Sequence, residues 1–255
     1  MHKQKAQNSA HATTIDQFTR QAVPFTRMPA HSDAIDRLVE IAKVHPLDHV
    51  LDIACGPGLV SNAFAKKAAH VTGIDLTQAM VDLANRNASS NTTFEIGDAA
   101  KLRFKEAQFD MVVTRYSIHH FEFPDECLAA MARVCKPGGK IVLADMQPPA
   151  RAKQAFNELE RLRDPSPQSA FTDTEMQKFI ETAGFELQAI ETYDVTVDLD
   201  EQLKSSFPNQ KDGERFRSLV IEDIGRDSYA IRSRCAGERY HYDYPIAIYL
   251  AKRKA

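Results

Sequence analysis

The sequence predicts an α/β fold built on a mostly parallel β-sheet with helices on both faces. Short apolar runs of strand length recur along residues 46–147. Segments with apolar residues at helical spacing separate these runs. Runs that alternate with helices in this way are typical of βαβ units, whose parallel strands are buried on both faces.

The strands and helices can be placed in order along the chain. A first helix is indicated by apolar residues at helical spacing, namely Ile35, Leu38, Val39 and Ala42. Five predicted strands follow, and they are HVLDIAC, HVTGID, TTFEIG, FDMVVTRYS and KIVLADM. Helical stripes lie between them, marked by Val60 and Phe64, by Met80 and Ala84, and by Leu128, Met131 and Ala132.

The pattern loosens after Met146. Thr172 and Glu175 have the spacing of a capping box, which predicts a helix start, and Gly184 predicts its end. A strand is expected near residues 185–197, a polar and helical insertion over 200–238, and a last strand at YPIAIYLAKR. We therefore expect one domain with a late insertion.

Composition and charge restrict the class of protein. The chain is 43% hydrophobic and 26% charged, with a formal net charge of −3. This balance argues against a nucleic-acid partner, because such proteins usually carry a basic surface. The polar start MHKQKAQNSAHATT is not a signal peptide. No apolar run approaches the ~20 residues of a membrane span, so we expect a soluble, cytoplasmic protein.

A glycine turn lies between the first strand and the next helix. In LDIACGPG, Gly56 and Gly58 would let a ligand approach the backbone closely. The third glycine of the dinucleotide fingerprint is absent, because position 61 is Ser. Asp52, inside the strand, suits a cationic ligand group better than a diphosphate. The turn alone leaves open a nicotinamide cofactor, S-adenosylmethionine and a plain tight turn.

Two further carboxylates follow the ends of later strands. Asp75 ends the second strand, where an acid can accept hydrogen bonds from both ribose hydroxyls. Asp98 follows the third strand, where it can accept from an adenine amino group. Together with Asp52, these residues are expected to face the crevice where open α/β sheets bind ligands.

The motifs VLDIACGPG, GIDLTQAM, GDAAKLRF, FDMVVTRYSIHHF and VCKPGGKIVLADM resemble those of class I S-adenosylmethionine-dependent methyltransferases. The most similar group is the ubiquinone/menaquinone-biosynthesis type. The resemblance implies a Rossmann-like sheet of seven strands with the last antiparallel, and S-adenosylmethionine as cofactor. It places Asp52, Gly56 and Gly58 beside the methionine part of the cofactor. It further implies roles for Asp75 at the ribose, Leu76, Asp98 and Ala99 at the adenine, Arg115 along the cofactor, and Phe18 in the covering segment.

This resemblance also assigns the parts of the chain. We expect residues 1–14 to be disordered and residues 15–255 to form a single methyltransferase domain. Within the domain, 15–45 would cover the cofactor, 46–147 would bind it, and 148–255 would supply the substrate-side insertions and last strands. One departure from the quinone enzymes is that His119 and His120 replace their usual arginine–asparagine pair.

The histidines suggest the chemistry. An imidazole can take a proton from a hydroxyl or an acidic carbon at neutral pH. His119 is predicted to be this base, and Asp145, at the end of the fifth strand, to orient it. The alternative is that one histidine only packs beside Phe121. No clustered set of Cys, His and Asp indicates a metal, and the four cysteines have no paired spacing.

The sequence thus predicts methyl transfer to an oxygen or carbon of a small-molecule substrate. The alternatives are a protein that binds the cofactor but catalyses another reaction, such as cyclisation, and a non-catalytic partner subunit. The acceptor, the methylated atom, the pathway and the oligomeric state are left open by the motifs.

Overall fold

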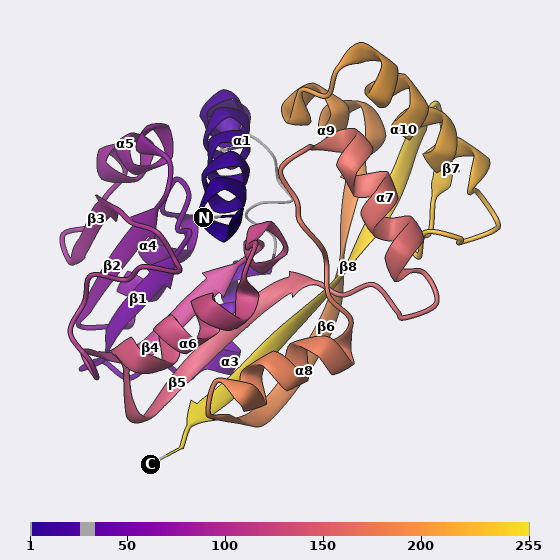
Figure 1. Ribbon diagram of the computed structural model, residues 1–255. Helices are drawn as coiled ribbons and strands as arrows, with labels where there is room; N and C mark the ends of the chain where they lie inside the picture. Colours follow the sequence, from indigo (N-terminus) through magenta and orange to yellow (C-terminus); the bar gives the residue numbers. More distant parts are fainter. Residues whose placement is uncertain (1, 26–33, 255) are drawn as a thin grey trace.

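The computed structural model describes residues 2–25 and 34–254 (Figure 1). An eight-stranded sheet in this part of the chain carries the fold, one strand more than the seven expected. Its strands are β1 His49–Ile53, β2 His70–Asp75, β3 Thr92–Ile96, β4 Phe109–Arg115, β5 Cys135–Met146, β6 Phe185–Asp198, β7 Arg234–Ala236 and β8 Arg239–Arg253.

The strand order confirms a mostly parallel sheet with an antiparallel last strand. The order is β3-β2-β1-β4-β5-β8-β6, and β7 pairs with β8 outside this path. Strands β1 to β5 pair in parallel, whereas β8 runs antiparallel to both β5 and β6. Because β1 to β5 are parallel, their carboxyl ends meet at one edge of the sheet.

The additional strand lies in the insertion that was expected to be helical. β7 forms a hairpin with β8, with Cys235 opposite Tyr240. Gly237 sits in the turn with φ +64, a backbone conformation that glycine adopts without strain. β8 thus begins at Arg239, earlier than predicted, because the alternating tyrosines before YPIAIYLAKR already belong to it.

Helices cover the sheet on both faces, as predicted. One face packs against α3 and α4, and the other against α6 and α8 (Figure 1). Within the described residues, no helix has the length and apolar character needed to cross a lipid bilayer. The helices are α1 His2–Phe25, α3 Ile35–Ala42, α4 Leu59–Ala65, α5 Gln78–Arg86, α6 Pro124–Val134, α7 Lys153–Arg163, α8 Asp173–Thr182, α9 Leu199–Ser206 and α10 Gln210–Glu222.

The predicted capping box is present at the start of α8. The Thr172 side chain accepts from the backbone N–H of Glu175, and the Glu175 carboxylate accepts from the backbone N–H of Thr172. Gly184 follows the helix with φ +88, as expected for a glycine that ends a helix. Local sequence signals were sufficient here because both partners lie within one turn.

Helix α1 differs from the expectation of disorder over residues 1–14, because it begins at His2. Figure 1 shows α1 standing above the carboxyl edge of the sheet, and it contacts α5 and α9. The Gln17 amide donates to the carbonyl of Ser206, and the Gln21 amide donates to Asp164 at 2.9 Å. These tertiary contacts stabilise a helix whose polar composition alone does not predict it. Residues 26–33 of the predicted covering segment lie outside the described residues.

A close contact in the sheet gives a stability prediction. A Cβ atom added at Gly73 of β2 would lie 2.6 Å from the Phe94 ring and 3.0 Å from the Cys55 sulfur. We expect Gly73→Ala to lower the free energy of unfolding by roughly 1–3 kcal/mol, since the neighbours must shift. Urea unfolding measures this. Glu95→Ala, at an exposed position of β3, is the control, with a change below about 0.5 kcal/mol.

Candidate active site

The glycine turn after β1 forms the floor of a pocket at the carboxyl edge of the sheet. Gly56 lines this pocket and has φ +54, and a Cβ atom there would meet nothing within 4 Å. The turn thus presents bare backbone to the open space, as the sequence predicted. Gly58 has another role, because its Cβ would lie 2.9 Å from the Phe94 ring. It is absent from the lining and allows α4 to pack closely on the sheet.

Asp75 ties this turn to the end of β2. Its two carboxylate oxygens accept the backbone N–H groups of Gly56 and Thr77, each at 2.9 Å. Burial raises the pKa of Asp75, although the hydrogen bonds from Thr77 and Gly56 oppose the shift. Each oxygen retains a second lone pair. The carboxylate lines the pocket and can accept a further hydrogen bond from a ligand.

We call the cavity around these residues the glycine-loop pocket. It has a volume of about 930 Å³, its open mouth included. Predicted residues that line it are Phe18, Gly56, Asp75, Leu76, Asp98, Ala99 and Arg115. The structure therefore brings together seven of the nine residues predicted to bind the cofactor. Asp98 lies in the loop after β3, where its carboxylate accepts the backbone N–H of Ala100 at 2.9 Å.

Asp52 lies beneath the turn rather than in the pocket wall. Its side chain is 1% exposed, and it accepts the hydroxyl of Ser61 at 2.6 Å. Burial raises the pKa of Asp52 from 3.8 to about 7, with the hydrogen bond from Ser61 as the largest opposing effect. Asp52 therefore holds the start of α4 against β1. Ser61, which marked the departure from the dinucleotide fingerprint, is its partner.

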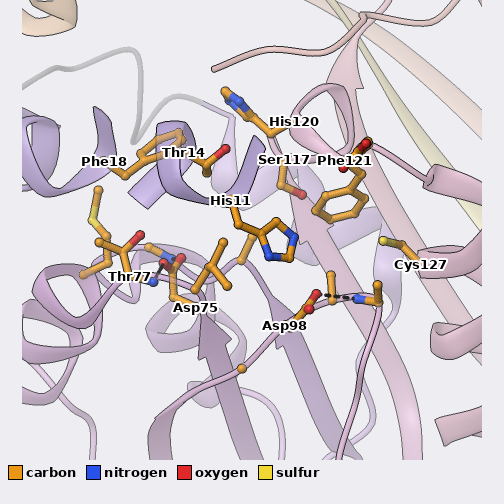
Figure 2. Close-up of a pocket in the computed structure, with 18 of the residues that line it drawn as sticks. His11, Thr14, Phe18, Asp75, Thr77, Asp98, Ser117, His120, Phe121 and Cys127 are labelled. Carbon is orange, nitrogen blue, oxygen red and sulfur yellow. Dashed lines mark hydrogen bonds between the residues drawn. The ribbon is translucent and has the colours of Figure 1, made fainter. Parts of the chain in front are cut away.

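Helix α1 contributes residues that the sequence did not predict. Figure 2 shows His11 and Thr14 pointing into the glycine-loop pocket, with the His11 ring between Asp75 and Cys127 in this view. Together with Phe18, they follow the spacing of one helix face. This spacing was the available signal, but the segment was expected to be disordered up to residue 14.

Residues at and after the end of β4 form another part of the wall of the glycine-loop pocket. Tyr116 has φ +56, in the left-handed region that a tyrosine rarely adopts, and this turns the chain out of the sheet. The Arg115 guanidinium lies 3.9 Å from the centre of the Tyr116 ring. Glu122 lines the pocket, and its buried Oε2 atom has no hydrogen-bond partner within the described residues. The pocket wall thus contains a buried acceptor atom without a partner among the described residues.

The two histidines lie on a short 3₁₀ turn, Ile118–His120, directly after this strand. The Nδ1 atom of His119 lies 2.6 Å from Asp145 Oδ1, and the His119 backbone N–H donates to Asp145 Oδ2 at 3.1 Å. Burial opposes the charge on Asp145, but the charge of His119 and its hydrogen bonds lower the pKa of Asp145. The carboxylate is therefore ionised and can only accept, so His119 donates from Nδ1 and leaves Nε2 unprotonated when the ring is neutral.

The His120 ring lies beside that of His119, with ring centres 4.1 Å apart, and is held by a second chain of hydrogen bonds. Its Nδ1 atom lies 3.2 Å from the Ser166 hydroxyl, which itself donates to Asp164 at 2.6 Å. Burial lowers the pKa of His120, helped by the neighbouring charge of His119, so this ring remains neutral near neutral pH. The Phe18 ring meets it edge-on, with ring centres 5.0 Å apart. His120 is therefore a neutral wall residue.

A second cavity, which we call the histidine pocket, adjoins the first. It has a volume of about 730 Å³ with its mouth included, and its lining contains both histidines. Phe18, Tyr116 and His120 line both pockets, so the two cavities meet at these side chains. The remaining wall comes from the end of β5, from β6 and the middle of β8, and from residues around α7 and α9. A ligand in one pocket would therefore lie next to a ligand in the other.

The comparisons with known proteins agree with this arrangement. A family model described as a methyltransferase domain matches residues 51–143. The uncharacterized methyltransferase YcgJ of Bacillus subtilis is 29% identical over 79% of this chain and 83% of its own length. A ubiquinone biosynthesis O-methyltransferase of Coxiella burnetii is 34% identical, but the match covers only 36% of this chain and 41% of that enzyme.

Solved structures extend the likeness to the whole fold. The protein BH2331 from Bacillus halodurans C-125 has a TM-score of 0.79 at 25% identity, covering 87% of this chain and 99% of that chain. Geranyl diphosphate methyltransferase in complex with S-adenosylmethionine has a TM-score of 0.64 at 15% identity, covering 88% and 85%. The chain is thus similar, in sequence and in its whole fold, to S-adenosylmethionine-dependent methyltransferases, and these matches support a methyltransferase with S-adenosylmethionine as its cofactor.

The glycine-loop pocket fits this cofactor. S-adenosylmethionine carries hydroxyl and amino donors and a positive sulfur, and the pocket offers the carboxylates of Asp75, Asp98 and Glu122. Apolar side chains such as Leu76 and Phe18 suit the adenine ring. Gly56 leaves the open space that a larger residue would fill.

The buried Asp52 gives a pH-dependent prediction. Between its ordinary pKa of 3.8 and about 7, the native chain holds a proton on Asp52 that the unfolded chain has lost. The free energy of unfolding therefore falls as the pH rises through this window, by roughly 4 kcal/mol in total.

Asp52→Asn cannot ionise and should lose this contribution to the pH dependence. Urea unfolding of both proteins at about pH 5 and about pH 8 measures the difference. We expect the variant to gain stability relative to the natural chain at the higher pH. Parallel pH profiles for the two proteins would show that Asp52 is already ionised in the native state.

Proposed function

We propose that the protein transfers a methyl group from S-adenosylmethionine to an oxygen or carbon of a small-molecule acceptor, with His119 as general base. The observation that carries this proposal is the buried His119–Asp145 pair, joined at 2.6 Å, in the wall of a cavity that meets the glycine-loop pocket. A base must lie beside the acceptor and not beside the cofactor, and His119 lines only the histidine pocket of these two.

We assign the cofactor to the glycine-loop pocket. Asp75 would accept from the ribose hydroxyls, while Asp98, Ala99 and Leu76 would border the adenine. Gly56 would allow close approach of the methionine part of the cofactor, and Arg115 and Phe18 would lie along the cofactor. Asp52 and Gly58 would support the glycine turn from behind. When bound, S-adenosylmethionine supplies a methyl group on a positively charged sulfur, which keeps the electron pair of the broken bond.

His119 and Asp145 would prepare the acceptor for this transfer. Asp145 accepts the Nδ1–H of His119. The Asp145 carboxylate is held in place by its burial and by the backbone N–H groups of His119 and Met146, which donate to it. The acceptor then loses its proton to Nε2 as its oxygen or carbon forms the new bond, and Asp145 stabilises the imidazolium. Holding the acceptor in line with the methyl carbon would supply much of the remaining rate enhancement.

The size and position of the histidine pocket favour a small acceptor. About 730 Å³ lies within the range of cavities that bind small molecules. Its lining is drawn from α1, α9 and the ends of strands, so an acceptor would be enclosed on several sides. The sequence match to a ubiquinone biosynthesis O-methyltransferase supports a small-molecule acceptor, although it covers only 36% of the chain.

Removing the base tests this proposal. We expect His119→Ala to lower turnover by about 10²–10⁴-fold, because the acceptor keeps its proton. Transfer of a tritiated methyl group from the cofactor to compounds of a metabolite extract measures turnover, and calorimetry measures cofactor affinity. The affinity should change little, because His119 does not line the glycine-loop pocket. His120→Ala is the comparison, and a loss of turnover confined to that variant would assign the base to the other ring.

Replacing Asp75 at the end of β2 should weaken cofactor binding, whereas replacing His119 should lower turnover. Asp75→Asn retains the size of the side chain but cannot accept as many hydrogen bonds. We expect the dissociation constant of S-adenosylmethionine to rise about 10–100-fold. Isothermal calorimetry checks this, with Asp82→Asn on the exposed side of α5 as the matched control. Unchanged affinity in Asp75→Asn would remove Asp75 from the cofactor site.

A further inference from the structure

Charged side chains are concentrated behind one wall of the histidine pocket. Arg163 lines this pocket, and its Nε and Nη2 atoms donate to Glu160 Oε2 at 3.1 and 2.8 Å. Its Nη1 atom lies 3.8 Å from Asp164 Oδ2 and donates to the Ser206 hydroxyl at 2.8 Å. The single guanidinium charge therefore faces two carboxylates. It is not available as a binding site for an anionic ligand.

The net charge around the pocket is negative in either state of the base. The carboxylates of Glu160, Asp164 and Asp145 back or line the wall, against Arg163 and, when protonated, His119. Three negative charges thus outweigh at most two positive ones. His120 adds no charge near neutral pH, because burial lowers its pKa. A phosphate or carboxylate entering this buried space would be repelled and would lose its hydration without gaining a partner.

The same carboxylates are already occupied by hydrogen bonds from the protein. Asp164 accepts the amide of Gln21 and both the backbone N–H and the hydroxyl of Ser166. Glu160 accepts from Arg163 and, through Oε1, from the Tyr244 hydroxyl at 2.9 Å. The exposed fraction of each carboxylate side chain is 2%. An ammonium group on a ligand would therefore have to compete with protein donors for these nearly buried carboxylate oxygens.

The rest of the wall is apolar where it is formed by β5, β6 and β8. Met146, Val195, Val197 and Ile246 line the pocket, and all four are buried. Burying an apolar group of a ligand against such a surface is favourable because it removes apolar surface from water. These side chains suit the hydrocarbon body of a ligand.

We infer that the methyl acceptor is an uncharged molecule whose apolar body lies along Met146, Val195, Val197 and Ile246, and that anionic and cationic acceptors are excluded. This inference rests on the proposed function and adds the class of acceptor. Its basis is the negative charge of the wall, together with carboxylates whose oxygens already accept hydrogen bonds from the protein and whose side chains are only 2% exposed.

A fractionated metabolite extract tests the charge of the acceptor directly. The extract is separated on anion and cation exchangers near neutral pH into anionic, cationic and unretained pools. Each pool is incubated with the full-length protein and S-adenosylmethionine that carries a tritiated methyl group. We expect the unretained pool to yield at least about tenfold more labelled product than either charged pool, since an unpaired buried charge costs several kcal/mol.

The outcomes separate this inference from the function beneath it. Label concentrated in the anionic or cationic pool would overturn the uncharged acceptor and leave methyl transfer intact. No label in any pool, despite cofactor binding by calorimetry, would overturn methyl transfer to a metabolite and the acceptor class with it.

A charge variant identifies the residues that select the acceptor. Asp164→Asn retains the shape of the wall and removes one negative charge, so the share of label in the anionic pool should rise severalfold. Glu160→Gln provides the same change at a second position. Asp82→Asn, at an exposed site on α5, is the control that should leave the share unchanged. An unchanged share in both Asp164→Asn and Glu160→Gln would contradict charge-based exclusion by this wall.

Discussion

The turn that carries His119 and His120, between the two pockets, is held by buried hydrogen bonds to Asp145. Asp145 lies near the end of β5 and holds the turn after β4 by accepting hydrogen bonds from both the ring and the backbone of His119. The carbonyl of His119 in turn accepts backbone N–H groups from Gln168 and Ser169. One residue thus connects two strand ends with the segment after α7. Because the turn is fixed, His120 is directed to the boundary between the pockets.

The charge of each pocket matches a different ligand. Around the glycine-loop pocket, Asp75, Asp98 and Glu122 suit a cofactor with a positive sulfur and several hydrogen-bond donors. Around the histidine pocket, the carboxylates are paired with protein donors and leave a wall that favours an uncharged molecule. The two pockets lie side by side because parallel strands bring their carboxyl ends to one edge. Chemistry between the two ligands would then occur at that edge.

Most of the residues predicted to bind the cofactor line one pocket because their positions follow local rules. Gly56, Asp75 and Asp98 stand directly at the ends of buried strands, and strand ends are marked by composition. The histidine pocket was harder to predict, since Arg163 on α7 and Tyr244 on β8 lie far from His119 along the chain and only the tertiary fold brings them to it. Helix α1 was missed because packing rather than composition stabilises it. Asp52 was expected to flank the cofactor, but its position under the turn depends on a contact with Ser61.

Nitrogen-15 NMR of the His119 imidazole tests the proposed role of this residue most directly. The ring can act as a base toward the histidine pocket only if its proton lies on Nδ1, facing Asp145. In protein labelled at histidine, with His119 assigned by comparison with His119→Ala, the neutral ring should show a protonated Nδ1 and an unprotonated Nε2. A proton on Nε2 of the neutral ring would contradict the assignment of His119 as the general base.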